Sequence, residues 1–152
     1  MLNSIVHRFL LWLERSEVDY YRKKMQVGNN VSIERGLRVK KPMNVTIGDD
    51  VSIGSNVTLE AQDSINIGDL TLIANNVIIV TANHDMSKRS RITSPVKIGR
   101  NCWLGSGVII LPGVTIGNET IVGAGSVVTK DLPPQMVCAG IPAKPLKPRL
   151  DS

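Results

Sequence analysis

The sequence is poor in aromatic residues, and this limits the kind of core it can build. Phe, Trp and Tyr make up 3% of the 152 residues, whereas 42% are hydrophobic, so the core must be aliphatic. Two cysteines, Cys102 and Cys138, are too few and too far apart for a disulfide framework or a zinc site of paired cysteines. We therefore expect a reducing compartment. A length of 152 residues also leaves room for only one domain of ordinary size.

The chain also lacks a long apolar run. A membrane-spanning helix needs about 18 consecutive apolar residues, and the apolar stretch at residues 9–13 is too short even for the core of a signal peptide. The segment Gly123-Ala124-Gly125 lacks the third glycine and the lysine–hydroxyl pair of phosphate-binding loops, which argues against nucleotide hydrolysis and dinucleotide binding. A soluble cytoplasmic protein is expected, whose net charge of +5 suits a nucleic acid, a membrane surface or a phosphorylated ligand.

What the sequence does have is a six-residue repeat. Aliphatic residues recur every six positions in five groups of three: Val27, Ile33 and Val39; Ile47, Ile53 and Leu59; Ile67, Ile73 and Ile79; Ile98, Leu104 and Ile110; Ile116, Val122 and Val128. An amphipathic helix would instead need apolar residues at three- and four-residue spacing. We predict an all-β fold over residues 26–132, a parallel β-helix of about five coils with three short strands per coil.

One coil is interrupted. Ile98 follows Ile67 by 31 residues, thirteen more than three hexads, and the extra residues fall between Ile79 and Ile98. The spacing predicts a polar loop at residues 83–95 that projects from the coil. Such insertions in repeat proteins often mark the binding face, although a tolerated surface insertion is the alternative.

The two ends of the chain follow different patterns. Residues 1–25 have helical spacing, with one side formed by Leu2, Ile5, Val6, Phe9, Trp12 and Leu13, and other positions occupied by Arg8, Glu14, Arg15 and Glu17. We favour an amphipathic helix that covers the open end of the coils over one that touches a membrane or a neighbouring subunit. Residues 133–152 are rich in proline and are expected to form an extended tail along the prism.

Three segments together are similar to a known family. Residues 96–117, 121–134 and 139–144 resemble the hexapeptide-repeat acetyltransferases, and most closely the maltose and galactoside group of sugar O-acetyltransferases. The resemblance runs from about Val27 onward and is strongest after His84. It implies a left-handed coil, whereas the general rule for parallel crossovers favours a right-handed one. It also implies acetyl-CoA as co-substrate and a homotrimer with each active site between two subunits.

Acetyl transfer to a hydroxyl needs a base that removes the hydroxyl proton, and imidazole suits this role. The sequence has two histidines, and His7 lies in the predicted helix, whereas His84 opens the long loop and matches the family's catalytic histidine. Cys102 occupies an inward position four after Ile98, which favours direct transfer over a covalent acyl-enzyme. His84 is therefore the predicted general base, and Asp85 or a backbone carbonyl is equally able to orient it.

The resemblance also implies a set of coenzyme A contacts. Trp103 would pack beside the pantetheine or the acceptor, Ser106 would meet the thioester end, and Ala124 would contact the pantetheine arm. Gly105 is a further implied contact. Basic groups suit the phosphates of coenzyme A. The remaining implied contacts, towards the nucleotide, are Thr129, Lys130, Lys144 and Lys147. Relatives have arginines at the positions of Lys144 and Lys147. No metal is expected.

The predicted function is transfer of an acetyl group from acetyl-CoA to a hydroxyl of a small saccharide or glycan precursor. An N-acetyltransferase acting on an amino sugar and a non-catalytic structural or binding β-helix are the alternatives. A zinc-dependent carbonic anhydrase would need three histidine ligands, and no nucleic-acid partner is expected. The basic loop residues Lys88, Arg89 and Arg91 suit an acidic acceptor or a solvated loop, so the acceptor, the acyl length and the acetylated atom stay open.

Overall fold

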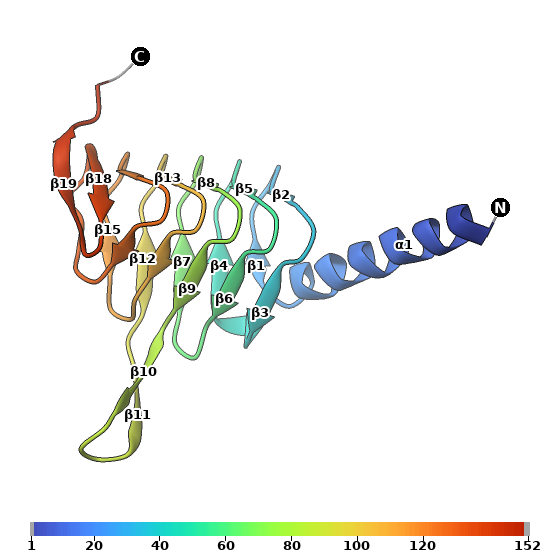
Figure 1. The fold of residues 1–152 in the computed structure, drawn as a ribbon, viewed down its shortest axis with the longest axis horizontal. Coiled ribbons are helices and arrows are strands. Elements are labelled where there is room, and N and C mark those ends of the chain that lie inside the picture. The colour runs from blue at the N-terminus through green and yellow to red at the C-terminus, as the bar shows by residue number, and fades with distance from the viewer. Residues whose placement is uncertain (1, 151–152) are drawn as a thin grey trace.

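The main body of the protein is a prism of stacked coils with three sheets as its sides, in which the strands of successive coils run parallel (Figure 1). The computed structural model describes residues 2–150. Residues 1, 151 and 152 of the predicted end segments lie outside this description, as do the side chains of Leu2, Leu13, Glu14 and Arg15. We call the three sheets face A, face B and face C, in the order in which the chain meets them.

Each face takes one short strand from each coil. Face A consists of β1 (Gln26–Val27), β4 (Val45–Ile47), β7 (Ile65–Ile67), β12 (Val96–Ile98) and β15 (Thr115–Ile116). Face B consists of β2 (Ser32–Ile33), β5 (Ser52–Ile53), β8 (Leu72–Ile73), β13 (Trp103–Leu104), β16 (Ile121–Val122), β18 (Met136–Gly140) and β19 (Ala143–Pro148). Face C consists of β3 (Arg38–Lys40), β6 (Thr58–Glu60), β9 (Ile78–Val80), β14 (Ile109–Ile110) and β17 (Val127–Val128).

The six-residue repeat forms the core. Of the fifteen predicted anchors, thirteen are buried, and the other two, Val27 and Ile33, are partly buried because the first coil has a neighbour on one side only. Equivalent anchors pair between coils, for example Ile47 with Ile67 and Leu104 with Val122. A coil therefore depends on its neighbouring coils to bury its apolar residues fully, as in other repeat proteins.

Five coils are complete, and the chain begins a sixth. Leu132 forms a parallel bridge with Ile116, and β18 pairs in parallel with β16. The segment predicted as an extended tail then folds back, because β19 pairs antiparallel with β18. The guanidinium of Arg149 donates hydrogen bonds to the carbonyl oxygens of Asn101 (2.7 Å) and Glu119 (3.2 Å), which ties the end of the described chain to the coils.

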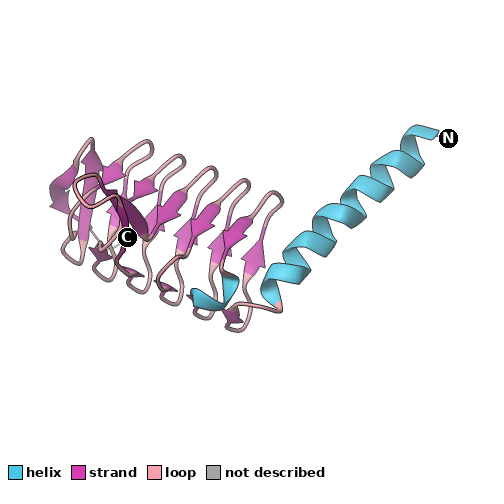
Figure 2. Ribbon diagram, turned by 90° about the horizontal axis from the view of Figure 1, so that it is seen from below, coloured by secondary structure: helices cyan, strands magenta, loops and turns pink. Residues whose placement is uncertain are grey.

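The N-terminal helix α1 (Leu2–Arg22) leaves the opposite end of the stack and extends away from it (Figure 2). Its last turn meets the coils: Tyr21 packs against the core, and Arg22 donates a hydrogen bond to the carbonyl oxygen of Val31 (2.8 Å). Apolar side chains further along are exposed, namely Ile5, Val6, Phe9, Trp12 and Tyr20. The favoured interpretation, a helix lying over the open end, is thus corrected, because α1 runs away from the stack beyond its last turn (Figure 2).

Candidate active site

A β-hairpin carries His84 away from the coils. Strand β10 (Ala82–Asp85) pairs antiparallel with β11 (Ser90–Thr93), and both project from the edge of face C (Figure 1). The hairpin occupies the interruption predicted at residues 83–95. At its base, the backbone N–H of Ser94 donates a hydrogen bond to the carbonyl oxygen of Thr81 (2.9 Å), which closes the hairpin where it leaves the coil.

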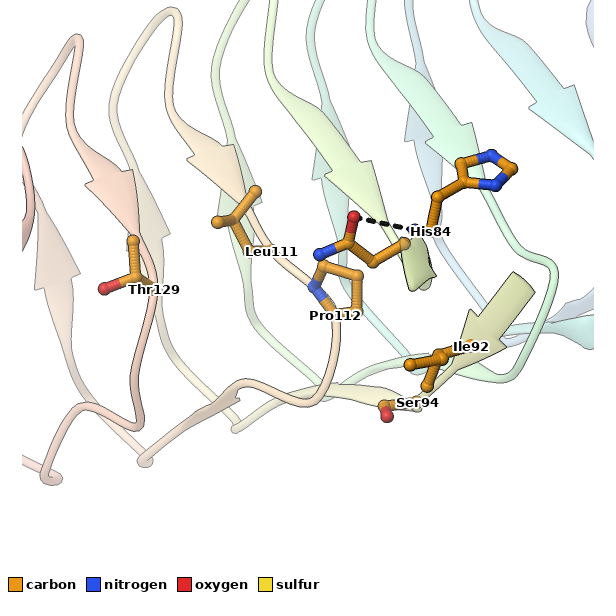
Figure 3. Close-up of a pocket in the computed structure, with 7 residues that line it drawn as sticks. His84, Ile92, Ser94, Leu111, Pro112 and Thr129 are labelled. Atoms are coloured by element: carbon orange, nitrogen blue, oxygen red, sulfur yellow. Dashed lines mark hydrogen bonds between the residues drawn. The ribbon is translucent and has the colours of Figure 1, made fainter. Parts of the chain in front are cut away.

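A pocket of about 310 Å³ lies where the hairpin meets face C (Figure 3). Its lining residues are Asn83, His84, Ile92, Ser94, Leu111, Pro112 and Thr129. The hairpin supplies one wall, while Leu111 and Thr129 follow β14 and β17 on the coils nearer the C-terminus. His84 itself is exposed, and its backbone N–H donates to Oδ1 of Asn83 (2.8 Å), which fixes the backbone at this position.

Asp85, the neighbour of His84 in sequence, is engaged in the hairpin turn. Its Oδ1 accepts hydrogen bonds from the hydroxyl of Ser87 and from the backbone N–H groups of Ser87 (2.9 Å) and Lys88 (3.2 Å). These bonds, the Ser87 hydroxyl first, hold the pKa of the Asp85 carboxyl below its ordinary value. The carboxylate therefore organises the tip of the hairpin.

The structure brings one predicted coenzyme A contact, Thr129, into the pocket with His84. Lys130 is exposed directly after it. Ser106 and Ala124 are exposed at the corner that joins face B to face C, in adjacent coils. Trp103 projects from face B and is 51% exposed, so it is not part of the core.

Two further predicted contacts, Lys144 and Lys147, are exposed on β19 at the end of face B. The close packing of adjacent coils requires a glycine at position 105, whether or not Gly105 contacts coenzyme A. A Cβ at this position would lie 2.6 Å from the backbone nitrogen of Ala124 in the next coil, so only glycine permits the coils to approach this closely. On the single chain, the predicted contacts are thus spread over face B, face C and the corner between them.

The outward residues of the three faces differ in chemistry. On face A, one row in register reads Gln26, Thr46, Asn66, Lys97 and Thr115, and it is polar throughout. The corresponding row on face B reads Ser32, Ser52, Leu72, Trp103, Ile121 and Val137. On face C the row reads Arg38, Thr58, Ile78, Ile109 and Val127. Two faces of the prism therefore become apolar from the third coil onward.

The sequence alone did not identify several residues of the site. Asn83, Ile92, Ser94, Leu111 and Pro112 line the pocket because the hairpin folds over neighbouring coils, and no spacing rule connects them. A further residue, Thr81, is buried, and its hydroxyl binds the preceding coil below the hairpin. Its signal in the sequence is slight: a polar residue two positions after Ile79, where the preceding coil has Ala61.

Both cysteines are unpaired and buried. The Cys102 thiol lies 3.1 Å from the carbonyl oxygen of Gly117, and burial raises the pKa of this thiol and of Cys138. Within residues 2–150, no cluster of three or more His, Cys, Asp or Glu residues is arranged to hold a metal ion. No helix in this described part is long and apolar enough to cross a membrane.

Two family models match the chain on either side of the hairpin. The model described as bacterial transferase hexapeptide (six repeats) matches residues 95–130, and the one described as hexapeptide repeat of succinyl-transferase matches residues 44–81. The segment between them contains His84.

Curated relatives include sugar-modifying enzymes. The putative colanic acid biosynthesis acetyltransferase WcaF of Escherichia coli K12 is 36% identical over 129 residues, which are 84% of this chain and 71% of that protein. The galactoside O-acetyltransferase of the same strain is 48% identical over 66 residues, which are 43% of this chain and 32% of that protein. The chain thus spans only about a third of some curated relatives that it matches.

Solved structures agree with this fold. A maltose O-acetyltransferase from Clostridium difficile 630 has a TM-score of 0.82 at 37% identity, over 88% of this chain and 74% of that one. A hexapeptide-repeat acetyltransferase from Vibrio cholerae, in complex with acetyl coenzyme A, has a TM-score of 0.85 at 30% identity, over 91% and 79%. The predicted left-handed parallel β-helix is confirmed.

Proposed function

Because the chain belongs to the family of hexapeptide-repeat acetyltransferases, we propose that it transfers an acetyl group from acetyl-CoA to a hydroxyl of a sugar or glycan precursor, with His84 as general base. The observation that carries this proposal is the position of His84. It is exposed on the hairpin that interrupts the coils, at the rim of a pocket that also contains Thr129.

The reaction is direct. An imidazole nitrogen of His84 takes the proton of the acceptor hydroxyl while the oxygen attacks the thioester carbonyl. The tetrahedral intermediate collapses with cleavage of the carbon–sulfur bond, and the coenzyme A thiolate receives the proton from the imidazolium. The products are an acetyl ester and coenzyme A. Ser106 is the proposed donor at the thioester end, where an N–H or O–H stabilises the oxyanion.

Acetyl-CoA would bind along the coils nearest the C-terminus. Thr129 and Lys130 would contact it beyond the pocket, with Ala124 along the pantetheine and Lys144 and Lys147 near the phosphates. Lys144 and Lys147 are exposed on β19, and the backbone of this strand pairs with β18. Their ammonium groups are therefore available to bind anions. Arg149, by contrast, is already bonded to two backbone carbonyl groups.

The two apolar faces support a homotrimer. If face B of one subunit packs against face C of the next, the contact is head-to-tail and closes into a threefold ring, while the polar face A stays in water. The arrangement would set Trp103 of one subunit opposite the His84 hairpin of its neighbour. The coenzyme A contacts that are spread over both faces of one chain would then meet in the cleft between two chains.

The expected cellular compartment is consistent with this chemistry. Two unpaired cysteines suit a reducing compartment, and we place the reaction in the cytoplasm. Contact between α1 and a membrane surface, or binding to nucleic acid, is not needed for it.

The test is a thiol-release assay with acetyl-CoA and a panel of neutral sugars and amino sugars. We expect a hydroxyl acceptor to release thiol, and His84→Ala to lower kcat about 100-fold or more at an unchanged Tm, because general-base catalysis contributes this much and the side chain is exposed. The matched control is His7→Ala, the other histidine, exposed on α1 and expected to act like wild type.

Two results would contradict the proposal. Activity with amino sugars alone would assign N-acetylation in place of O-acetylation. Equal activity of His84→Ala and wild type with every acceptor would remove His84 from the mechanism.

A further inference from the structure

The two sides of the His84 hairpin face different parts of the molecule. Directly opposite residues of an antiparallel pair project to the same side, and successive residues alternate. Asn83 pairs with Ile92, and both line the pocket with Leu111 and Thr129 from the coils that follow. This side of the hairpin is therefore the side of the proposed acetyl-CoA site.

The opposite side carries His84 and Arg91, which pair directly across the two strands. The Nη1 atom of Arg91 lies 3.4 Å from Oε1 of Gln62, which follows β6 in the coil preceding the hairpin. In agreement, the ring of His84 is directed away from Leu111 and Thr129 (Figure 3). The imidazole and the guanidinium thus share one side, on which an acceptor can approach. His84 also lines the pocket, so it stands at the border between this side and the proposed acetyl-CoA site.

Arg91 keeps hydrogen-bonding capacity in this position. A guanidinium has five N–H donors, and the structure shows one of its nitrogens on Gln62, a neutral partner that leaves the positive charge uncompensated. Cross-strand neighbours are typically about 5 Å apart at Cβ, so the long Arg91 side chain and the His84 ring can both reach one small ligand.

The charge around this pair is positive. The hairpin has three basic side chains, Lys88, Arg89 and Arg91, and one acidic side chain, Asp85, whose carboxylate is bonded within the tip. On the adjacent coil, Glu60 is exposed in register with Lys40.

Asp63, the other carboxylate of that coil near Gln62, accepts a hydrogen bond from the backbone N–H of Ser64 (2.7 Å). The nearby acidic groups therefore have partners or a basic neighbour in register, whereas Arg91 has a neutral partner.

We propose that Arg91 binds an anionic group of the acceptor, a carboxylate or a phosphate, and so makes the enzyme selective for acidic sugars. A guanidinium binds either group through two parallel N–H donors, which orients the ligand as well as attracting it. With the anionic group on Arg91, a hydroxyl elsewhere on the same sugar lies at His84. This inference rests on the proposed acetyl transfer and names its class of acceptor.

The test compares three acceptors that differ in one substituent: galactose, galacturonic acid and galactose 6-phosphate. We expect wild type to acetylate at least one of the acidic sugars about tenfold or more better than galactose in kcat/KM. Arg91→Gln should lose about 10- to 100-fold on that acidic sugar, mainly through KM, and should stay within about twofold on galactose. Preference between the two acidic sugars identifies the anionic group.

Two further variants separate recognition from structure. Lys88→Gln removes a charge from the turn of the same hairpin, outside the paired strands that carry His84 and Arg91, and should leave the selectivity unchanged. Arg91→Lys should restore part of the preference for the acidic sugar, because it returns the charge without the paired donors. A merely structural role of Arg91 would lower activity on galactose and on the acidic sugar by the same factor.

The outcomes distinguish this inference from the proposed function. If wild type acetylates galactose as well as or better than both acidic sugars, and His84→Ala loses that activity, acetyl transfer stands and the role of Arg91 is refuted. If wild type acetylates none of the three and none of the wider panel, both are refuted.

Discussion

Thr81, directly before the hairpin, allows a test of how the coils hold the segment that carries His84. Thr81 is fully buried between β9 and β10. Its hydroxyl accepts a hydrogen bond from the backbone N–H of Asp63 (2.9 Å) and donates to the carbonyl oxygen of Glu60 (3.0 Å). A single hydroxyl thus joins the start of the hairpin to the preceding coil.

Replacement by valine keeps the shape but removes the hydroxyl. The carbonyl oxygen of Glu60 still accepts the backbone N–H of Thr81 (3.2 Å), whereas the N–H of Asp63 loses its partner. An unsatisfied donor of this kind costs about 1–3 kcal/mol, so we expect Thr81→Val to lower the free energy of unfolding by about 2 kcal/mol. Thr81→Ser keeps the hydroxyl and loses one methyl group, which costs about 1 kcal/mol.

The assay is urea unfolding followed by far-ultraviolet circular dichroism, at one protein concentration because assembly adds to the apparent stability. The expected order of stability is wild type, then Thr81→Ser, then Thr81→Val. Side-chain volume and apolarity alone would put Thr81→Val above Thr81→Ser. If valine is the more stable of the two, the hydroxyl is not what holds the hairpin.

Three other predictions concern the coils and their surfaces. Gly68→Ala should lower the free energy of unfolding by about 3 kcal/mol and reduce the Tm, because the added Cβ would lie 2.7 Å from the backbone of the next coil; an unchanged Tm would refute this close approach. Trp103→Glu on face B should reduce the assembled mass in analytical ultracentrifugation, whereas Lys97→Glu on the polar face A should not; equal masses would contradict the proposed interface. Burial raises the pKa of the Cys102 and Cys138 thiols above that of the unfolded chain, so their contribution to stability is complete below about pH 8.5 and is lost as the pH rises through the folded pKa. We expect no reaction with Ellman's reagent at pH 8 until urea is added, and reaction of the native protein would show that the thiols are accessible.

The coils could be predicted from the repeat because a six-residue period fixes which side chains point into the prism. A residue such as Leu104 must point inward once every sixth residue does, and it is fully buried. The same reasoning failed for the helix, since spacing shows that α1 has an apolar side but not what covers that side. It also could not foresee that residues 136–148 form the β18–β19 hairpin, because that pairing depends on a free edge of face B.

At the candidate site, spacing predicted the projecting loop, and the resemblance singled out His84 within it. The hairpin register was not predictable, because the loop contains no strong turn signal that would fix its pairing. The register is what sets Arg91 opposite His84 and directs Asn83 to the other side.

The sequence by itself determined the coil period, the apolar core and the chemical group that can act as a base. Only the tertiary structure decided which residues of different segments line one pocket, such as Thr129 and His84, and which faces of the prism are apolar. The physical reason is that an anchor needs only its own inward position in the coil. A site or a surface row depends on the parallel register between coils, which backbone hydrogen bonds set for all coils together.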